Sequence, residues 1–498
     1  MFLENRRAHD HAPLQLLPHL VSSANCIMNT KRADMNESQD RSPVTPKRRW
    51  PRILFVVFLV IVIAFGIYRY TLHLMVEARL DEIRKQGLPV TPAELDRWYE
   101  EPPPGENATE LYLQAFSKLR DQWIPTRTNL LVVGVAKLPS RTEPLAEEMK
   151  KQFAELVAEN AEALRLLHQA AAKQKCRYPD DLTKGCRVQF RRSHKVRRAA
   201  ELLKLNMIYQ IEAGHPELAV RSTVDLLKLA RSLEEEPMDM PQILRTTCIR
   251  FAISGQERLL SRAELESTQL DALMTAVREC EATNAMWKTT IGDRCRMLDC
   301  FHEFASKSRP LDQDEKDTME VMEWDRTFPL SWNFWIYRNS GLLQLDELCY
   351  LDGKEKLLQA AGRGFPERLR MVESFERHAA EFPKYYNFSR SLSGFANCFE
   401  LEACCVARIR CAVAALAVER YRAAKGSLPD SLDNSVSTLL PAVPVDPFDG
   451  KMIRYKKLLK GYVVYSVGKD QEDNGGKEAK SAFYASPPGT DITFAVER

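Results

Sequence analysis

The residue types that most often carry catalysis are sparse in this sequence and stand in no complete motif. Glu303 directly follows His302, as in the first half of the helical zinc-protease motif H-E-x-x-H. The second histidine of that motif is missing, because Ser306 occupies its position. The chain also lacks a G-x-S-x-G nucleophile turn, a Walker phosphate loop and a dinucleotide-binding glycine pattern. We therefore assign no catalytic residue from the sequence.

Cysteine is the other residue type that could carry chemistry. The 12 cysteines include no C-x-x-C pair, so neither a zinc ribbon nor a thioredoxin-like redox site is indicated. Cys176 and Cys186 flank a polar loop, and a disulfide between them would close it. Cys404, Cys405 and Cys411 fall on one predicted helix, where cysteine is more often a small buried apolar residue than a metal ligand.

Composition limits the classes of partner. The chain has 498 residues, a formal net charge of +3 and a pI of about 8.2. Basic residues are scattered among acidic ones, and no basic stripe alternates with aromatic residues. The sequence therefore predicts no nucleic-acid partner.

One apolar stretch must position everything that follows it. Residues 53–68 carry no charged or amide side chain, and as a helix they would extend for roughly 24 Å. With the flanking residues up to Met75, the span reaches the hydrocarbon thickness of about 30 Å. A buried core helix would carry polar residues at every third or fourth position, and a cleaved signal would have a shorter run with a small-residue cleavage site. We therefore predict a transmembrane signal-anchor over residues 47–75.

The charges beside this stretch predict its orientation. Lys47, Arg48, Arg49 and Arg52 precede the apolar run. The positive-inside rule then places the N-terminus in the cytoplasm and residues 76–498 on the far side of the bilayer. The same basic cluster suits anionic lipid headgroups, so the membrane lipid bilayer is the first expected partner.

The remaining chain divides by composition. Residues 1–46 are polar, turn-rich and aperiodic, which predicts a disordered cytoplasmic tail. Residues 76–395 show helical spacing almost throughout, which predicts a large helical extracytoplasmic domain. The predicted helices cover residues 76–86, 93–100, 106–121, 143–173, 195–213, 217–235, 240–260, 263–281 and 282–307.

Residues 196–236 form the pattern of a helical hairpin with a turn at Gly214. Two helices of about 17 residues joined in this way are similar to one tetratricopeptide (TPR-like) unit of about 34 residues. No second copy follows at that period, and a solenoid needs about three stacked repeats. We therefore expect a single TPR-like hairpin within a larger helical domain.

The composition changes in the last hundred residues. A helix is expected from about Phe399 to Lys425, and Gly426 to Pro429 end it. Alternating apolar residues then predict strands at 453–455, 462–467 and 492–496. The predicted fold class is therefore mainly α, with an N-terminal transmembrane helix, a large helical body and a small α+β module at 396–498. In this module, a long helix packs on a short antiparallel sheet.

Five stretches of this C-terminal module follow a recognisable order and spacing, namely Ala417–Arg422, Gly426–Pro429, Val445–Gly450, Tyr455 and Gly461–Asp470. In these residues the module resembles the globular end of the major pseudopilin of type II secretion systems. The anchor lacks the prepilin-peptidase junction, which needs a glycine and a glutamate where Arg52 and Val57 stand, so the resemblance does not imply a polymerising pilin.

The resemblance also implies a calcium site, because that family binds calcium in the loop after its last paired strand. Asp470 and Asp473 would supply carboxylates, and Asp491 would close the loop from the far side. A hard cation takes about six to eight oxygen ligands, and the acidic, glycine-rich loop 470–476 can wrap around one. The alternative is a solvated acidic turn at the end of the strand.

The chain as a whole resembles a group of large, uncharacterised, bacterial, single-pass membrane-anchored proteins, in residues 95–99, 106–108 and 226–237. This resemblance implies a bacterial inner (cytoplasmic) membrane but no activity. The leading hypothesis is an extracytoplasmic interaction or scaffold protein that binds a protein partner outside the cytoplasm. The alternatives are an accessory component of a type II secretion or pilus-like apparatus, and an envelope hydrolase whose site assembles from distant helices.

Overall fold

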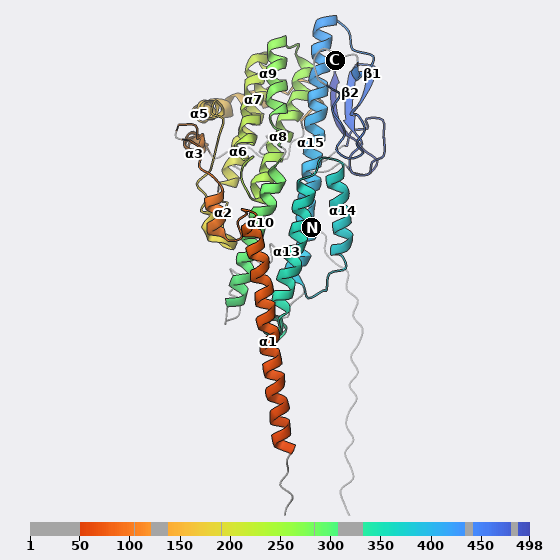
Figure 1. Ribbon diagram of the computed structural model, residues 1–498. Helices are drawn as coiled ribbons and strands as arrows, with labels where there is room; N and C mark the ends of the chain where they lie inside the picture. Colours follow the sequence, from red (N-terminus) through yellow and green to blue (C-terminus); the bar gives the residue numbers. More distant parts are fainter. Residues whose placement is uncertain are drawn as a thin grey trace, which may run out of the picture. The chain divides into compact units, whose positions relative to one another are not determined.

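The computed structural model of the chain describes residues 50–103, 105–120, 138–190, 192–282, 284–306, 332–433, 442–479 and 487–498. Within them the protein is mainly helical, with a small three-stranded antiparallel sheet near the C-terminus, as the sequence predicts (Figure 1). Residues 63–498 form one compact unit.

The elements follow in chain order, beginning with α1 (Trp50–Lys85), α2 (Pro92–Trp98), α3 (Thr109–Lys118), α4 (Glu147–Glu159), α5 (Ala161–Ala171), the 3-10 helix η2 (Leu182–Arg187), α6 (Ser193–Glu212) and α7 (Pro216–Arg231). They continue with α8 (Asp239–Arg262), α9 (Ser267–Arg278), α10 (Ala285–Ser306), α12 (Trp332–Asn339), α13 (Leu342–Ala361), α14 (Glu367–Ala379), α15 (Asn387–Lys425), β1 (Arg454–Leu458), β2 (Gly461–Ser466) and β3 (Ile492–Glu497).

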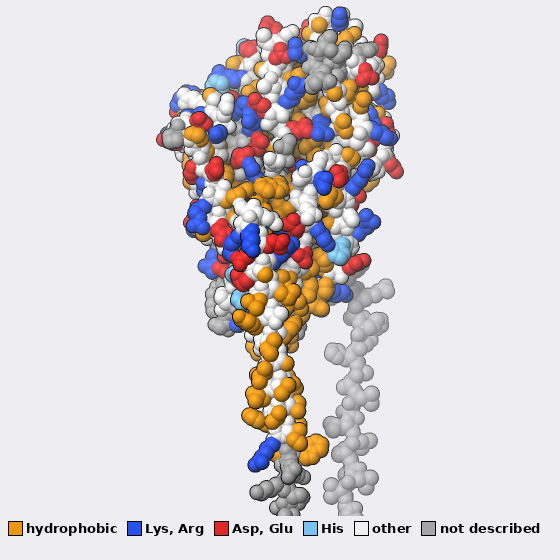
Figure 2. All heavy atoms as spheres, viewed as in Figure 1, with side chains coloured by type: hydrophobic (Ala, Val, Ile, Leu, Met, Phe, Trp, Pro, Cys, Tyr) orange, Lys and Arg blue, Asp and Glu red, His pale blue; other side chains and the backbone are white. Residues whose placement is uncertain are grey.

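Helix α1 joins the predicted anchor and the first predicted body helix into one helix of 36 residues. Hydrophobic side chains cover its first part and are exposed (Figure 2). Its buried residues begin at Leu72 and continue with Val76, Leu80 and Ile83, a spacing that places them on one face. The last turn of the predicted anchor therefore packs into the compact unit. The predicted tail, residues 1–46, lies outside the described residues.

A single predicted helix at 143–173 is two helices, α4 and α5, which are separated at Asn160. The Asn160 side chain is buried, donates to the Leu156 carbonyl at 3.0 Å and accepts from the Arg120 backbone N–H at 3.0 Å. Asparagine competes with the helical hydrogen bonds in this way, which ends α4.

The hairpin predicted at 196–236 is present as α6 and α7. Gly214 supplies the left-handed conformation of the turn, with φ at +77°, and Pro216 begins α7. Helix α8 packs against both α6 and α7, so the hairpin is part of a larger helical layer. Its likeness to a TPR unit stays a prediction.

Helix α15 has 39 residues and begins 12 positions before the predicted start at Phe399. The reason lies on another helix, because the Asp346 carboxylate of α13 accepts from the backbone N–H groups of Phe388 and Ser389 at 3.0 and 2.9 Å. A carboxylate placed there satisfies amides that the helix itself leaves unbonded. The predicted boundary between residues 395 and 396 consequently falls inside α15.

The sheet has the order β1-β2-β3 and packs on α15 through β2 and β3. The register pairs Tyr455 with Val464 and Val464 with Phe494. Tyr462 is buried and donates to the Ala415 carbonyl at 3.1 Å, which fixes the sheet against the helix. On its other sides α15 contacts α8, α9, α13 and α14, so it runs through the centre of the compact unit (Figure 1).

Candidate functional site

The three predicted calcium ligands are engaged in fixing their own loop. Asp473 accepts from the Gly475 backbone N–H and the Tyr465 hydroxyl, both at 3.0 Å, and the Gly475 contact is the main favourable cause of its lowered pKa. Asp470 accepts from the Gly489 backbone N–H at 2.8 Å. These bonds hold the loop in shape, and those to Asp473 favour its ionised form.

Asp491 is nearly fully buried at the opposite end of the same loop. It accepts from the backbone N–H groups of Gly476, Lys477 and Asn474 at 2.7, 3.2 and 3.3 Å. Burial raises the pKa of Asp491, and these three donors oppose the shift. Across the described ranges, no three His, Cys, Asp or Glu side chains are grouped so that they could hold a metal ion. Calcium binding by Asp470, Asp473 and Asp491 thus stays a prediction.

The predicted motif Val445–Gly450 contains a second carboxylate with a structural role. Asp446 is fully buried and accepts from the Val467 backbone N–H, the Ser466 hydroxyl and an Arg454 guanidinium N–H at 3.0, 2.9 and 3.0 Å. These bonds join the segment before β1 to the end of β2. The motif therefore contributes to the fold of the module.

A disulfide between Cys176 and Cys186, which the sequence left open, is not formed, and all the cysteines in the described part of the chain are free. Cys176 is buried with its sulfur 3.2 Å from the Thr109 hydroxyl. Cys186 instead lies beside Cys300, and this contact, with burial, raises the pKa of its thiol. The loop is held by other contacts, among them the bond from the Cys186 N–H to Asp299 at 3.0 Å.

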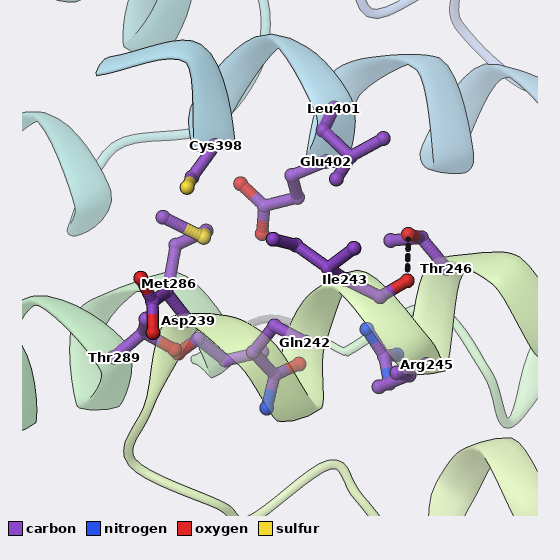
Figure 3. Close-up of a pocket in the computed structure, with 11 residues that line it drawn as sticks. Asp239, Gln242, Ile243, Arg245, Thr246, Met286, Thr289, Cys398, Leu401 and Glu402 are labelled. Atoms are coloured by element: carbon purple, nitrogen blue, oxygen red, sulfur yellow. Dashed lines mark hydrogen bonds between the residues drawn. The ribbon is translucent and has the colours of Figure 1, made fainter. Parts of the chain in front are cut away.

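A small cavity lies where α8, α10 and α15 meet (Figure 3). Cys398 and Glu402 extend from α15 toward Gln242 of α8. Glu402 forms an ion pair with Arg368 at 2.6 Å, while its Oε1 and the Oε1 of Gln242 receive no hydrogen bond from the described residues. The cavity volume of about 20 Å³ is enough for about one water molecule or a small ion and excludes a metabolite.

Beside this cavity, α10 and α13 share a buried ion pair. Lys354 is fully buried, and its Nζ lies 2.6 Å from Oδ2 of Asp293. Arg296 approaches the other oxygen of Asp293 at 2.6 Å, and Tyr350 donates to Oδ2 at 3.3 Å. Burial alone would raise the pKa of Asp293, but Lys354 and Arg296 outweigh it and hold the value at about 2. This cluster joins three helices, because Nζ of Lys354 also lies 3.3 Å from the ring centre of Phe395 on α15.

A larger pocket of about 590 Å³ lies between α6, α8 and the segments beside β3. Lys204 and Glu257 line it, together with Arg141, Arg258 and Glu478. Burial lowers the pKa of Lys204 to about 8 and raises that of Glu257 to about 7. Its volume lies in the range of small-molecule sites, and shifted titratable groups in such a pocket favour a ligand-binding role.

The carboxylates of this pocket are held by arginine. Arg141 contacts both oxygens of Glu478 at 2.6 Å and lies 3.7 Å from Glu257. Glu257 also accepts from the Ala495 backbone N–H at 2.8 Å. No sequence motif indicates this pocket, because its residues come from five separated segments.

No protein family, no curated protein and no solved structure matches this chain. The C-terminal likeness to a pseudopilin therefore stays a prediction from the sequence.

Proposed function

We propose that this protein is anchored by α1 in the bacterial inner membrane and acts as an interaction or scaffold protein on the outer side. The observation that supports the anchor is the exposure of α1. Every large apolar side chain from Ile53 to Tyr68 is at least 41% exposed. Transfer of each such side chain out of water is worth about 1.5–3 kcal/mol, so lipid would stabilise the helix by an amount on the order of 20 kcal/mol.

The proposed orientation follows from the four basic residues within positions 47–52. The scaffold role is supported by the way the helices are joined. The buried ion pairs Asp293–Lys354 and Arg368–Glu402 connect α10 to α13 and α14 to α15. Breaking such a pair by removing one partner is strongly destabilising, so each pair holds its two helices in one arrangement. The body is thus suited to present a fixed surface to a partner.

The test of the anchor compares two arginine substitutions. The double variant Leu59→Arg/Ile61→Arg adds two charges to the apolar stretch, at a cost of about 2.5–3.5 kcal/mol each for insertion. We expect it to lose retention in alkali-washed membranes. The matched control is Ala78→Arg, on the same helix but beyond the stretch, and it should be retained like the wild type. A double variant that stays in the washed membranes would contradict the anchor.

The test of orientation uses enzyme fusions to the C-terminus. Alkaline phosphatase, which is active only outside the cytoplasm, should be active, and a cytoplasm-dependent fluorescent protein should be dark. The reverse result would refute the orientation. For the scaffold role, chemical cross-linking in intact membranes followed by purification should recover a stoichiometric partner, and its absence would count against that role.

The pocket of about 590 Å³ supports a second candidate, an envelope hydrolase. A carboxyl with a pKa near 7, such as Glu257, is protonated often enough to act as a general acid. Turnover of a fluorogenic ester, amide or glycoside that disappears in Glu257→Gln and persists in Lys195→Gln, a substitution outside the pocket lining, would favour this candidate. A lack of turnover across all three substrate classes would argue against it.

A further inference from the structure

Where α1 enters the compact unit, exposed aromatic side chains gather from three distant segments. Tyr68 and Tyr70 of α1, Trp335 of α12 and Tyr385 before α15 are 41, 63, 60 and 49% exposed. Ile336 beside Trp335 is 47% exposed. We call these five residues the aromatic rim.

Direct contacts place α12 against α1 at this level. Arg69 of α1 donates to the Arg338 carbonyl of α12 at 3.1 Å. At Gly341, just after α12, a methyl group would lie 2.9 Å from ring carbon Cε1 of Tyr68 and 2.9 Å from Cδ1 of Leu72. The backbone after α12 therefore touches the same two turns of α1 that carry Tyr68 and Tyr70.

A buried carboxylate holds the other two segments of the rim together. Asp346 of α13 is fully buried and accepts from the Tyr337 hydroxyl of α12 at 2.5 Å. The same carboxylate accepts from the first amides of α15, Phe388 and Ser389. The buried Tyr337 side chain thus fixes α12 to the interior, while the side chains of its neighbours Trp335 and Ile336 remain exposed.

The position of the rim along α1 matches the thickness of a bilayer. Trp50 and Tyr68 are separated by 18 residues on one helix, or about 27 Å, close to the hydrocarbon thickness of about 30 Å. Tryptophan and tyrosine are enriched at both membrane–water interfaces because their rings are apolar and their edges polar. In Figure 2, hydrophobic side chains cover α1 and gather on the adjoining surface.

We propose that the aromatic rim is a second membrane contact, which inserts Trp335 and Ile336 into the headgroup region of the bilayer that α1 spans. This inference rests on the proposed anchor. The occupant is phospholipid rather than a partner protein, because the rim is continuous with the lipid-exposed part of α1. The exposed Lys384 and the half-buried Arg338 flank the rim, and their charges suit anionic headgroups.

The test measures quenching of tryptophan fluorescence by brominated lipids. The full chain is reconstituted into phosphatidylcholine–phosphatidylglycerol vesicles with bromine near the carbonyl end of the acyl chains. We expect the quenched part of the emission to fall in Trp335→Phe and in Trp50→Phe. In the control Trp98→Phe the quenched part should stay, because Trp98 is half-buried against Trp287, at a ring distance of 6.0 Å, and does not belong to the rim.

The two proposals fail in different ways. If the vesicles carry the protein on flotation and Trp50→Phe loses quenching while Trp335→Phe does not, the rim contact is refuted and the anchor stands. If the protein does not float with the vesicles and Trp50→Phe has no effect, the anchor fails and the rim contact fails with it. Because the vesicles contain no other protein, quenching of Trp335 there excludes a partner protein as the sole occupant. Phosphatidylcholine alone should give weaker quenching of Trp335 than the mixture, and equal quenching would refute the role of Lys384 and Arg338.

Discussion

The buried pair Asp293–Lys354 allows a sharp test of how the helices are held together. Asp293→Asn keeps the shape of the side chain but leaves the Lys354 ammonium without a carboxylate. Apart from Asp293, the described contacts of that ammonium are with the rings of Tyr350 and Phe395. Leaving one charge of a buried pair uncompensated costs about 3–5 kcal/mol, so we expect Asp293→Asn to lower the free energy of unfolding by this amount.

Substituting Lys354 instead of Asp293 should lower the free energy of unfolding by a smaller amount. In Lys354→Met, Asp293 keeps Arg296 at 2.6 Å and the Tyr350 hydroxyl at 3.3 Å, so its charge remains compensated. The double variant removes the Asp293–Lys354 pair but leaves Arg296 with only Asp239, at 3.9 Å, as a carboxylate partner among the described residues, so it should lose less stability than Asp293→Asn and more than Lys354→Met. The expected order of stability loss is therefore Asp293→Asn, then the double variant, then Lys354→Met.

The assay is chemical unfolding of the detergent-solubilised full chain, followed by tryptophan fluorescence, with the interaction energy taken from the double-mutant cycle. Acid gives an independent check. The folded pKa of Asp293, about 2, lies below the unfolded value near 4, so its contribution is complete above pH 4 and is lost as the pH falls toward 2. Asp293→Asn should remove this part of the acid sensitivity. A loss below about 1 kcal/mol for Asp293→Asn, or a larger loss for Lys354→Met, would refute the reasoning.

Three further predictions concern a buried carboxyl group, a close backbone contact and the calcium loop. Burial raises the pKa of Glu347 to about 8, so the folded state binds the extra proton and stability falls as the pH rises from about 4.5 to 8. The free energy of unfolding of Glu347→Gln should equal that of the wild type at pH 4 and exceed it at pH 8 by an amount on the order of 3–5 kcal/mol. A difference that does not change with pH would contradict this. A methyl group at Gly292 would clash with the Pro237 carbonyl oxygen, so Gly292→Ala should lower the free energy of unfolding by about 3 kcal/mol or more. Gly255→Ala, which meets only a flexible side chain, should lose less, and equal losses would count against the close backbone contact. Millimolar calcium should raise the melting temperature of the full chain over that in chelator, and Asp473→Asn should abolish the shift; equal melting temperatures would remove the calcium assignment.

Much of the fold could be predicted because its signals are local. The apolar run 53–68, the turn at Gly214 and the alternation in 462–467 each depend on neighbouring residues, and the structure has a helix, a helical hairpin and a strand at these places. The start of α15 could not be predicted, because the carboxylate that caps it belongs to Asp346, 41 residues before Asn387 in the chain. Local pattern also missed the break at Asn160, whose partner Arg120 is equally remote.

The candidate site was less predictable than the fold for the same physical reason. Charged residues on a helix usually indicate a solvated face, so Lys354 and Asp293 gave no signal of burial in the sequence. Only their meeting at 2.6 Å makes burial of both tolerable. The pocket lined by Lys204 and Glu257 is likewise assembled from separate segments, and neither residue belongs to a recognisable motif.

Helix α13 connects the aromatic rim to the buried Asp293–Lys354 pair, and the sequence predicted neither of them. Asp346, Tyr350 and Lys354 are spaced by four residues, so they lie along one face of the helix. At one end of this face, Asp346 holds the aromatic rim by accepting from Tyr337. At the other end, Lys354 holds α10 through its ion pair with Asp293. If each end acts only on its own neighbour, Asp293→Asn should lower stability without changing the quenching of Trp335. Tyr337→Phe should change the quenching of Trp335 without lowering stability, because it removes the hydrogen bond that holds α12 and leaves the Asp293–Lys354 ion pair intact. Loss of quenching in both variants would show instead that α13 transmits a disturbance from the core to the membrane surface.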